Sequence, residues 1–141
     1  MKIKRDKRDD VFSKLVRERA ENSCEWCGKY CGPKHEHGRL DCSHIFSRRH
    51  MATRWHPDNA VAHCFTCHKK YGENPVAATR WLIEQFGQGY VDLLEEKKNT
   101  IRKFTKADKE DLYKHYKKEY AKMMDLRDSG IVGRIDFESY D

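Results

Sequence analysis

The sequence predicts a small α+β domain with a helix before its core and a helical extension after it. Three observations lead to this fold class. Apolar residues recur at helical spacing near the N-terminus and through the last third of the chain. Two short runs between these regions nearly alternate apolar and polar residues, as strands do. Two C-x-x-C pairs enclose the strand region, and 141 residues leave room for one such domain.

The first expected element is an amphipathic helix from about Asp9 to Ala20. Two acidic residues at its start favour the helix dipole. Its apolar positions have i, i+3 and i+4 spacing: Val11, Phe12, Leu15 and Val16. The chain then reaches "NSCEWCGKYCG", where the glycines predict a tight, knuckle-like turn.

Two short strands and a short helix are expected next. The run "GRLDCSHIF", from Gly38 to about Phe46, predicts the first strand, and "AVAHC" from Ala60 predicts its partner. The connecting "SRRHMATRWHPDN" is interpreted as a polar loop rich in Arg and His. "FTCHKKYG" then predicts a short helix that Gly72 stops.

Three further helices are expected in the extension. Asn74 and Pro75 fit the N-cap and first residue of a helix that ends at Gly87. Its apolar face is Ala78, Leu82, Ile83 and Phe86. A second helix is expected from Gly89 to about Lys98.

The longest helix is expected to begin at a capping pair, Thr105 and Asp108, and to end near Gly130. Its stripe is Leu112, Tyr113, Tyr116, Tyr120, Met123 and Met124. An intramolecular or homodimer contact is favoured for this stripe over a platform that stacks bases. The final "IVGRIDFESYD" has no clear period.

These elements predict four regions. Residues 1–23 form a basic N-terminal segment and helix, and residues 24–73 form the core. Residues 74–130 form the helical extension, and residues 131–141 form a C-terminal tail.

The composition favours a polyanionic partner and a reducing compartment. Twenty-nine Lys and Arg against 23 Asp and Glu give a net charge of +6, although charge alone does not separate nucleic-acid binding from simple solubility. The basic start lacks the apolar region of a secretory signal, and no later run is long and apolar enough to span a membrane. We therefore expect a cytoplasmic protein without membrane contact, in which paired cysteines are metal ligands and not disulfides.

The two cysteine pairs predict a structural zinc site. Cys24 and Cys27 form one knuckle, and Cys64 and Cys67 form the other. Four thiolates complete the tetrahedral shell that zinc prefers. A redox pair would occur singly at a helix start, and an apolar fraction of 38% leaves a small core that bound zinc would stabilise. Cys31 and Cys42 are interpreted as small buried residues, with Cys31 as an alternative ligand.

Polar residues between and beside the knuckles have a pattern that suggests chemistry. In a helix that starts at Cys64, Cys67 can face the zinc while His68 faces the strand that carries His44, because adjacent residues point about 100° apart. A neutral imidazole at His68 can bind a divalent metal, and His44 can take a proton from water. Asn59 can hydrogen-bond across the loop and fix the geometry of His44.

At this point the chain resembles the HNH endonucleases with a ββα-metal core, and more narrowly the phage recombination protein NinG (Rap) family. The residues that carry the resemblance are "VFSKLVRER", "CEWCG", "LDCSHIFSRRH", "TRWHPDNAVAHCFTCHKKYGENP" and "ATRWLIEQFG". They span roughly Asp9 to Lys98, and motif order, cysteine spacing and flanking helices all match.

The resemblance implies roles for individual residues. His44 would be the general base, Asn59 the central N of the motif, and His68 a ligand of a catalytic Mg²⁺ or Mn²⁺. The usual second ligand position holds Ser43, a poor ligand, whereas Asp41 lies on the same strand face about 6–7 Å further back. The NinG-like pattern also has Asp there, so we expect Asp41 to be the ligand, provided that a bulge or bend brings it to the metal.

Three arginines are candidates for contacts with DNA phosphates. Arg48 and Arg49 directly follow the first strand, and Arg54 lies further along the loop. A solvated arginine loop is the alternative interpretation. Lys-rich flanks (Lys2 to Arg8, Lys97 to Lys106 and Lys114 to Lys122) favour backbone contacts without base readout.

The sequence therefore predicts a metal-dependent, structure-selective DNA endonuclease. By resemblance, its substrates are branched recombination intermediates such as D-loops and Holliday junctions, in the host cytoplasm if a phage encodes it. A non-catalytic zinc-stabilised DNA-binding protein and a general DNA-nicking HNH endonuclease are the alternatives.

Overall fold

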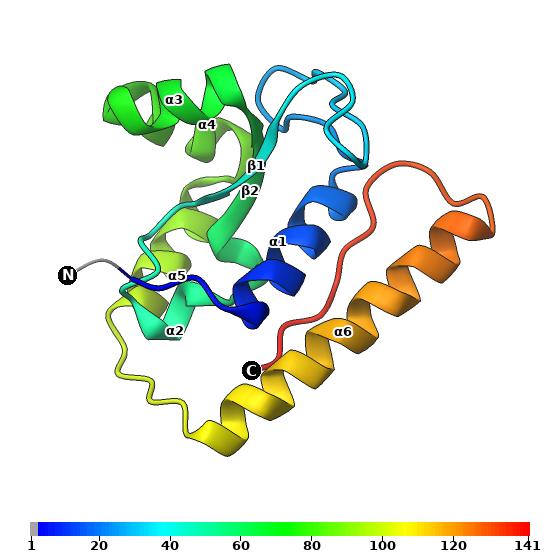
Figure 1. Cartoon of the computed structure of the whole chain (residues 1–141). Coiled ribbons are helices and arrows are strands. Elements are labelled where there is room, and N and C mark those ends of the chain that lie inside the picture. The colour runs from blue at the N-terminus through cyan, green and yellow to red at the C-terminus, as the bar shows by residue number, and fades with distance from the viewer. Residues whose placement is uncertain (1–2) are drawn as a thin grey trace.

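The computed structural model describes residues 3–141 as an α+β fold built around a two-stranded antiparallel hairpin (Figure 1). Lys2, at the start of the expected basic flank, lies outside the described residues. Along the chain the elements are α1 (Lys7–Arg19), β1 (Leu40–His44), α2 (Met51–Arg54), a 3-10 turn η1 (Pro57–Asn59), β2 (Ala60–Cys64), α3 (Phe65–Glu73), α4 (Pro75–Phe86), α5 (Gln88–Lys98) and α6 (Lys106–Asp128).

The N-terminal helix α1 begins two residues before the expected start. Asp6 is its N-cap, and its side chain accepts a hydrogen bond from Arg8 N at 2.8 Å. The Asp9 carboxylate in turn accepts one from Asp6 N at 2.9 Å. This reciprocal capping satisfies backbone donors that would otherwise lack partners, and it places the helix start at Lys7.

The hairpin has a regular register that runs from Leu40 opposite Cys64 to His44 opposite Ala60. Because side chains alternate along a strand, the positions of Leu40, Cys42 and His44 face α1, whereas Asp41 and Ser43 face the side of α3 and α4. The two faces belong to two clusters. The larger one joins the hairpin to α1, α6 and the C-terminal tail, and the smaller one joins Val61 to Trp81 and Leu82 of α4.

The connection between the strands is not the polar loop that we expected. It contains α2 and η1, and it buries Trp55 at 3% exposure. The indole Nε1 of Trp55 donates to Asp9 Oδ1 at 3.0 Å, and Arg54 Nη2 contacts Asp9 Oδ2 at 2.7 Å. Asp9 is itself 3% exposed, and it ties the start of α1 to this connection through a buried ion pair.

The short helix α3 passes through Gly72 and ends at Glu73, so the expected stop at Gly72 was wrong by one residue. The helix α3 ends there because Asn74 precedes Pro75, and a residue before proline is disfavoured in helical conformation. Asn74 then caps α4 through Ala77 N at 3.1 Å, and Gly87 ends α4 with φ of 93°, as expected. Trp81 is buried on α4 beside the expected apolar face.

The long helix α6 has the expected capping box of Thr105 and Asp108, and it packs along α1 (Figure 1). Its stripe lies within the chain, because Tyr116 and Met123 are buried in the larger cluster. The stripe is therefore an intramolecular contact. Arg127 fastens the far end by an ion pair to Glu18 at 3.0 Å.

The C-terminal tail is extended and returns along α6 (Figure 1). Ile135 N donates to Arg19 O at 3.2 Å, and Glu138 N donates to Glu119 Oε1 at 2.8 Å. The Phe137 ring packs edge-on against Phe12, with centroids 5.9 Å apart. The tail thus closes the core that α1 and α6 form, although its sequence has no period that predicts this.

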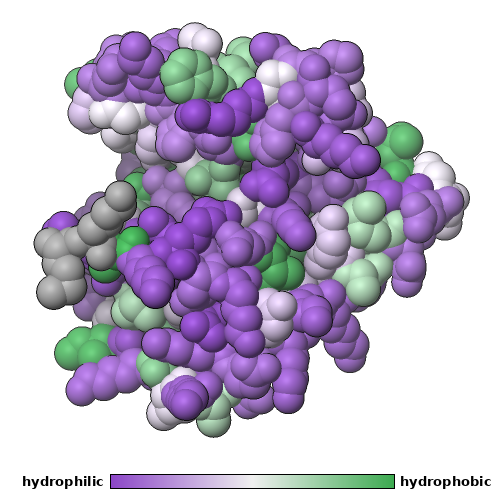
Figure 2. Space-filling model, viewed as in Figure 1, coloured by the Kyte–Doolittle hydropathy of each residue, from purple (hydrophilic) through white to green (hydrophobic). Residues whose placement is uncertain are grey.

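Figure 2 shows a mostly hydrophilic surface on the face in view. Within residues 3–141, no helix combines the length and the apolar character that crossing a membrane requires.

Candidate metal centre and active-site grooves

The four predicted zinc cysteines meet at one point. Their sulfur atoms all lie within 4.8 Å of one another, although the two pairs are far apart in sequence: Cys24, Cys27, Cys64 and Cys67. The first pair lies on a tight turn in which Cys27 N donates to the Cys24 sulfur at 3.5 Å. Gly28 completes this turn with φ of 80°, a conformation that favours glycine. The second pair lies at the end of β2 and in the first turn of α3.

The spacing and chemistry of the group fit a zinc ion. At a zinc–sulfur distance of about 2.3 Å, tetrahedral ligands are about 3.8 Å apart. Cys27 Sγ and Cys64 Sγ are 3.7 Å apart, which suits this geometry and is far longer than a disulfide bond. Burial and the neighbouring sulfurs raise the pKa of the Cys67 thiol, so a bound cation is what would make four thiolates stable together.

The two remaining cysteines lie outside this group. The buried Cys31 sulfur is 3.8 Å from Arg39 O and 3.9 Å from Lys29 O, which are backbone contacts. Burial raises the pKa of Cys42 to about 12, so this thiol stays protonated. Cys31 is therefore the buried residue that the sequence favoured and is not one of the clustered sulfurs, whereas Cys42 is only partly buried.

His44 ends β1 and lies against Phe12 of α1, with ring centroids 6.2 Å apart. Its Nε2 is covered and has no hydrogen-bond partner in the described part of the chain. Burial, followed by the positive charge of Arg48, lowers the pKa of His44 to about 4. The imidazole is therefore neutral at neutral pH, which is the state that can accept a proton.

Asn59 fixes the backbone that follows His44. Its side chain accepts from Phe46 N at 2.8 Å and donates to Phe46 O at 2.9 Å, and its own carbonyl accepts from Ile45 N at 2.8 Å. Asn59 is fully buried. The three bonds hold the chain leaving β1 against η1, so the position of His44 is set from both strands.

His68 and Asp41 are direct neighbours. α3 carries Cys67 toward the cysteine group and His68 toward β1, so one short helix does face both places. The His68 Nδ1 atom is 2.8 Å from Asp41 Oδ2, and Arg39 Nη2 is 2.9 Å from the same oxygen. Burial raises the pKa of Asp41, but the bonds from His68 and Arg39 outweigh it and lower that pKa below its ordinary value.

No bulge is needed to bring Asp41 to His68. The hairpin pairs without interruption from Leu40 to His44, and α3 lies over Asp41 itself. The expectation of a bend in β1 was therefore wrong. Adjacent ligands of an octahedral ion with bonds of about 2.1 Å are about 3 Å apart, so the 2.8 Å spacing fits shared ligation as well as a hydrogen bond.

Two grooves meet at His68. The first, which we call the His44 groove, has a volume of about 660 Å³ and includes Ser43, His44, Ser47, His68 and Lys69 in its lining. The second, which we call the Arg17 groove, has a volume of about 380 Å³ and includes Arg5, Ser13, Arg17, His35 and Asp41. Arg39 and His68 line both grooves.

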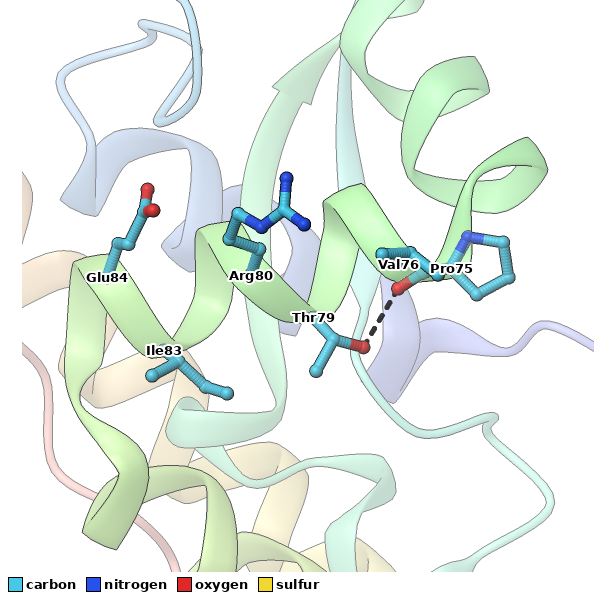
Figure 3. Close-up of a pocket in the computed structure, with 6 residues that line it drawn as sticks. All are labelled: Pro75, Val76, Thr79, Arg80, Ile83 and Glu84. Atoms are coloured by element: carbon cyan, nitrogen blue, oxygen red, sulfur yellow. Dashed lines mark hydrogen bonds between the residues drawn. The ribbon is translucent and has the colours of Figure 1, made fainter.

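A separate hollow of about 730 Å³ lies along α4 (Figure 3). Its lining includes the apolar Pro75, Val76 and Ile83. The Thr79 hydroxyl is occupied by a bond to Pro75 O at 2.8 Å. This hollow contains neither a cysteine nor a histidine, and it shares no lining residue with the two grooves.

The three candidate DNA-binding arginines have different surroundings. Arg49 is exposed after the strand, and its backbone N–H donates to Ser47 Oγ at 3.3 Å. The Arg48 side chain is 27% exposed and lies 3.6 Å from Asp9. Arg54 is 7% exposed and paired with Asp9, so its guanidinium makes a contact inside the fold.

Some important residues were missed in the sequence. Asp9 was interpreted as a favourable charge for the helix dipole, although it lies three residues before Phe12 and seven before Val16, which places it on the buried face. That spacing could have identified it. Arg17 and Arg39 gave no such signal, because their groove forms only when α1 packs beside β1.

A family model described as "Bacteriophage Lambda NinG protein" matches residues 3–127. No curated protein and no solved structure matches the chain.

Proposed function

The chain belongs to the bacteriophage lambda NinG family, and we propose that it is a metal-dependent, structure-selective DNA endonuclease with an HNH (ββα-metal) core. Its proposed substrates are branched recombination intermediates such as D-loops and Holliday junctions. The observation that carries this proposal is the His44 groove, where a neutral histidine at the end of β1 lines the same hollow as His68 on α3. A scaffold that only bound zinc would need neither histidine.

His44 is the proposed general base. Because Nε2 is covered, Nδ1 is the ring nitrogen that we expect to take a proton from water. The resulting hydroxide attacks phosphorus in line, the bond from phosphorus to the 3′ oxygen breaks, and the 3′ oxygen leaves with the bonding pair. Asn59 keeps His44 in place through its bonds to Phe46.

His68 and Asp41 are the proposed holders of a catalytic Mg²⁺ or Mn²⁺. His68 Nδ1 and Asp41 Oδ2, which are 2.8 Å apart, would be the two protein ligands of the ion. Such an ion would stabilise negative charge on the phosphate oxygens and on the leaving oxygen. The lowered pKa of Asp41 keeps its carboxylate charged for this role.

Arg48 and Arg49 are the proposed phosphate contacts beside the His44 groove. Both lie shortly after β1, just beyond the backbone that Asn59 fixes at Ile45 and Phe46. We propose no such contact for Arg54, because it is only 7% exposed and its guanidinium is held 2.7 Å from Asp9, whereas Arg48 is more exposed and lies 3.6 Å from Asp9.

A cleavage panel tests the proposed activity. Linear duplex, flapped, D-loop and four-way DNA are incubated with the purified protein in Mg²⁺, in Mn²⁺ and in chelator. We expect strand cleavage of the branched DNA in the presence of metal. Binding without cleavage in every metal would instead indicate a non-catalytic DNA-binding protein, and cleavage of linear duplex without branch preference would indicate a general nicking enzyme.

The low pKa of His44 predicts an unusual pH profile. A base must be deprotonated, so kcat/KM should fall only as the pH drops toward about 4. With an ordinary histidine as the base, kcat/KM would fall near pH 6.5. Arg48→Gln removes a positive charge that lowers the pKa of His44, so the acidic limb should move to higher pH.

The measurement is kcat/KM on one branched substrate from about pH 3.5 to about pH 8, with zinc content checked at each pH. A wild-type limb at the ordinary histidine value would contradict the assignment of His44 as a buried neutral base. An unmoved limb in Arg48→Gln would contradict the electrostatic cause.

A further inference from the structure

We propose that the Arg17 groove is a second phosphate site, which holds a backbone phosphate next to the one in the His44 groove. This inference rests on the proposed function for the identity of the ligand, a DNA strand. It adds a binding site formed by Arg5, Arg17 and Arg39, of which only Arg5 lies in a basic flank that the sequence analysis named.

The charge of the groove is unbalanced. Arg5, Arg17 and Arg39 line it from the N-terminal segment, α1 and the segment before β1, whereas Asp41 is its one lining carboxylate. Arg39 pairs with Asp41 at 2.9 Å, and Arg5 pairs with Asp10 at 2.6 Å. The groove therefore gathers more positive charge than its own acidic residue neutralises.

The surroundings of Arg17 indicate an anion site most strongly. Its side chain bonds to the Ser13 hydroxyl, and none of the ion pairs found within residues 3–141 includes it. Burial lowers the pKa of the Arg17 guanidinium, and the nearby charge of Arg5 lowers it further. A half-buried cation beside a second cation is unfavourable while the groove holds no anion. A bound anion would remove this cost.

The chemistry of the lining suits a phosphate. Guanidinium groups present several N–H donors in a planar fork that matches phosphate oxygens, and the Ser13 hydroxyl and His35 lie in the same lining. The Asp41 carboxylate would repel an anion, but Arg39 and His68 already bond to it. Arg17, which none of these ion pairs includes, would be the main phosphate contact, and Arg5 and Arg39 would add positive charge beside it.

The position of the Arg17 groove indicates how a phosphate bound there would act on the DNA strand. Arg39 and His68 line both grooves, so a strand that passes over His68 leaves the His44 groove and enters the Arg17 groove directly. A phosphate held there would fix the register of the strand across His44. Phosphate contacts of this kind position a nucleic acid without reading its sequence, in line with a preference for DNA structure.

The test is the salt dependence of DNA binding with cleavage prevented by chelator. The affinity for a labelled four-way junction is measured over a range of salt concentrations for wild type, Arg17→Gln and Arg5→Gln. Loss of one phosphate contact should lower affinity about tenfold and reduce the slope of log K against log salt by about 1. Arg17→Lys keeps the charge and should keep most of the slope.

Arg80→Gln is the matched control. It removes the same charge from an exposed arginine on α4, beside the separate hollow (Figure 3). Its affinity and slope should equal those of wild type. Arg5, which is half exposed, repeats the test if Arg17→Gln fails to fold.

The outcomes separate this inference from the proposed activity. If wild type cleaves DNA but Arg17→Gln and Arg5→Gln bind like Arg80→Gln, the second phosphate site is wrong and the nuclease stands. If wild type never cleaves but Arg17→Gln loses slope, the site is a DNA contact of a non-catalytic protein. An equal loss in Arg80→Gln would show only a general charge effect and would overturn the site.

Discussion

Cys64→Ser is expected to lose the bound zinc and to unfold the domain. Cys64 supplies a sulfur to the four-cysteine group, and it lies where β2 ends and α3 begins. Structural zinc sites contribute about 10–16 kcal/mol in small zinc domains. The whole stability of a domain is about 5–15 kcal/mol, so the fold has no comparable reserve. Metal analysis should return about one tightly bound zinc per wild-type chain, and circular dichroism should show loss of helix in the variant.

Cys42→Ala is the control for this experiment. Cys42 lies on β1 and is part of the larger cluster, but its sulfur is outside the metal group. This variant should keep its zinc and its helices. A wild-type protein that stays folded and zinc-free in chelator would contradict the prediction.

The cysteine site was the most predictable feature, because its chemistry is local. Each C-x-x-C pair forms from one turn, and zinc needs four thiolates, so the spacing alone indicates the partners. The strand pair and α4 were predictable for a similar reason, since alternation and the Asn74-Pro75 start are short-range signals. The family match over residues 3–127 agrees with the resemblance that these motifs carry.

Contacts between distant segments were not predictable. Asp9 meets Arg54 and Trp55 across the connection that we took for a polar loop. No pattern in either segment indicates that the two segments are in contact. In the sequence alone, the two residues of a buried ion pair cannot be distinguished from two solvated charges. The pairing of Asp41 with His68 was expected, but the way in which the fold brings the two side chains together was not. Strand spacing suggested a gap, but the direction of α3 closes it.

The positions of the groove arginines were not predictable from the sequence either. The Lys-rich flanks dominate the sequence, whereas the arginines that line the two grooves beside His68 are dispersed along it. Arg17 and Arg39 come together only through the packing of α1 beside β1. Counting charges predicted a polyanionic partner, and the fold is needed to indicate where its phosphates would lie.

His44→Ala is expected to reduce DNA cleavage by about 10²–10⁴-fold, the usual contribution of a general base. DNA affinity in chelator and zinc content should remain near wild type, because His44 Nε2 has no hydrogen-bond partner in the described part of the chain and His44 lies outside the cysteine group. His44→Gln keeps a polar side chain against Phe12 and should lose activity to a similar extent. Single-turnover cleavage of a four-way junction measures the effect.

His50→Ala is the matched control, since His50 is an exposed histidine shortly after the same strand and makes no side-chain bond at the start of α2. It should cleave like wild type. If both His44 variants retain wild-type cleavage while His68→Ala abolishes it, the proton is removed by another group and His44 is a packing residue. If His44 and His68 variants are both inactive and still bind DNA, both histidines are required for cleavage and not for binding. The groove that the two histidines share then marks the place where the strand is cut.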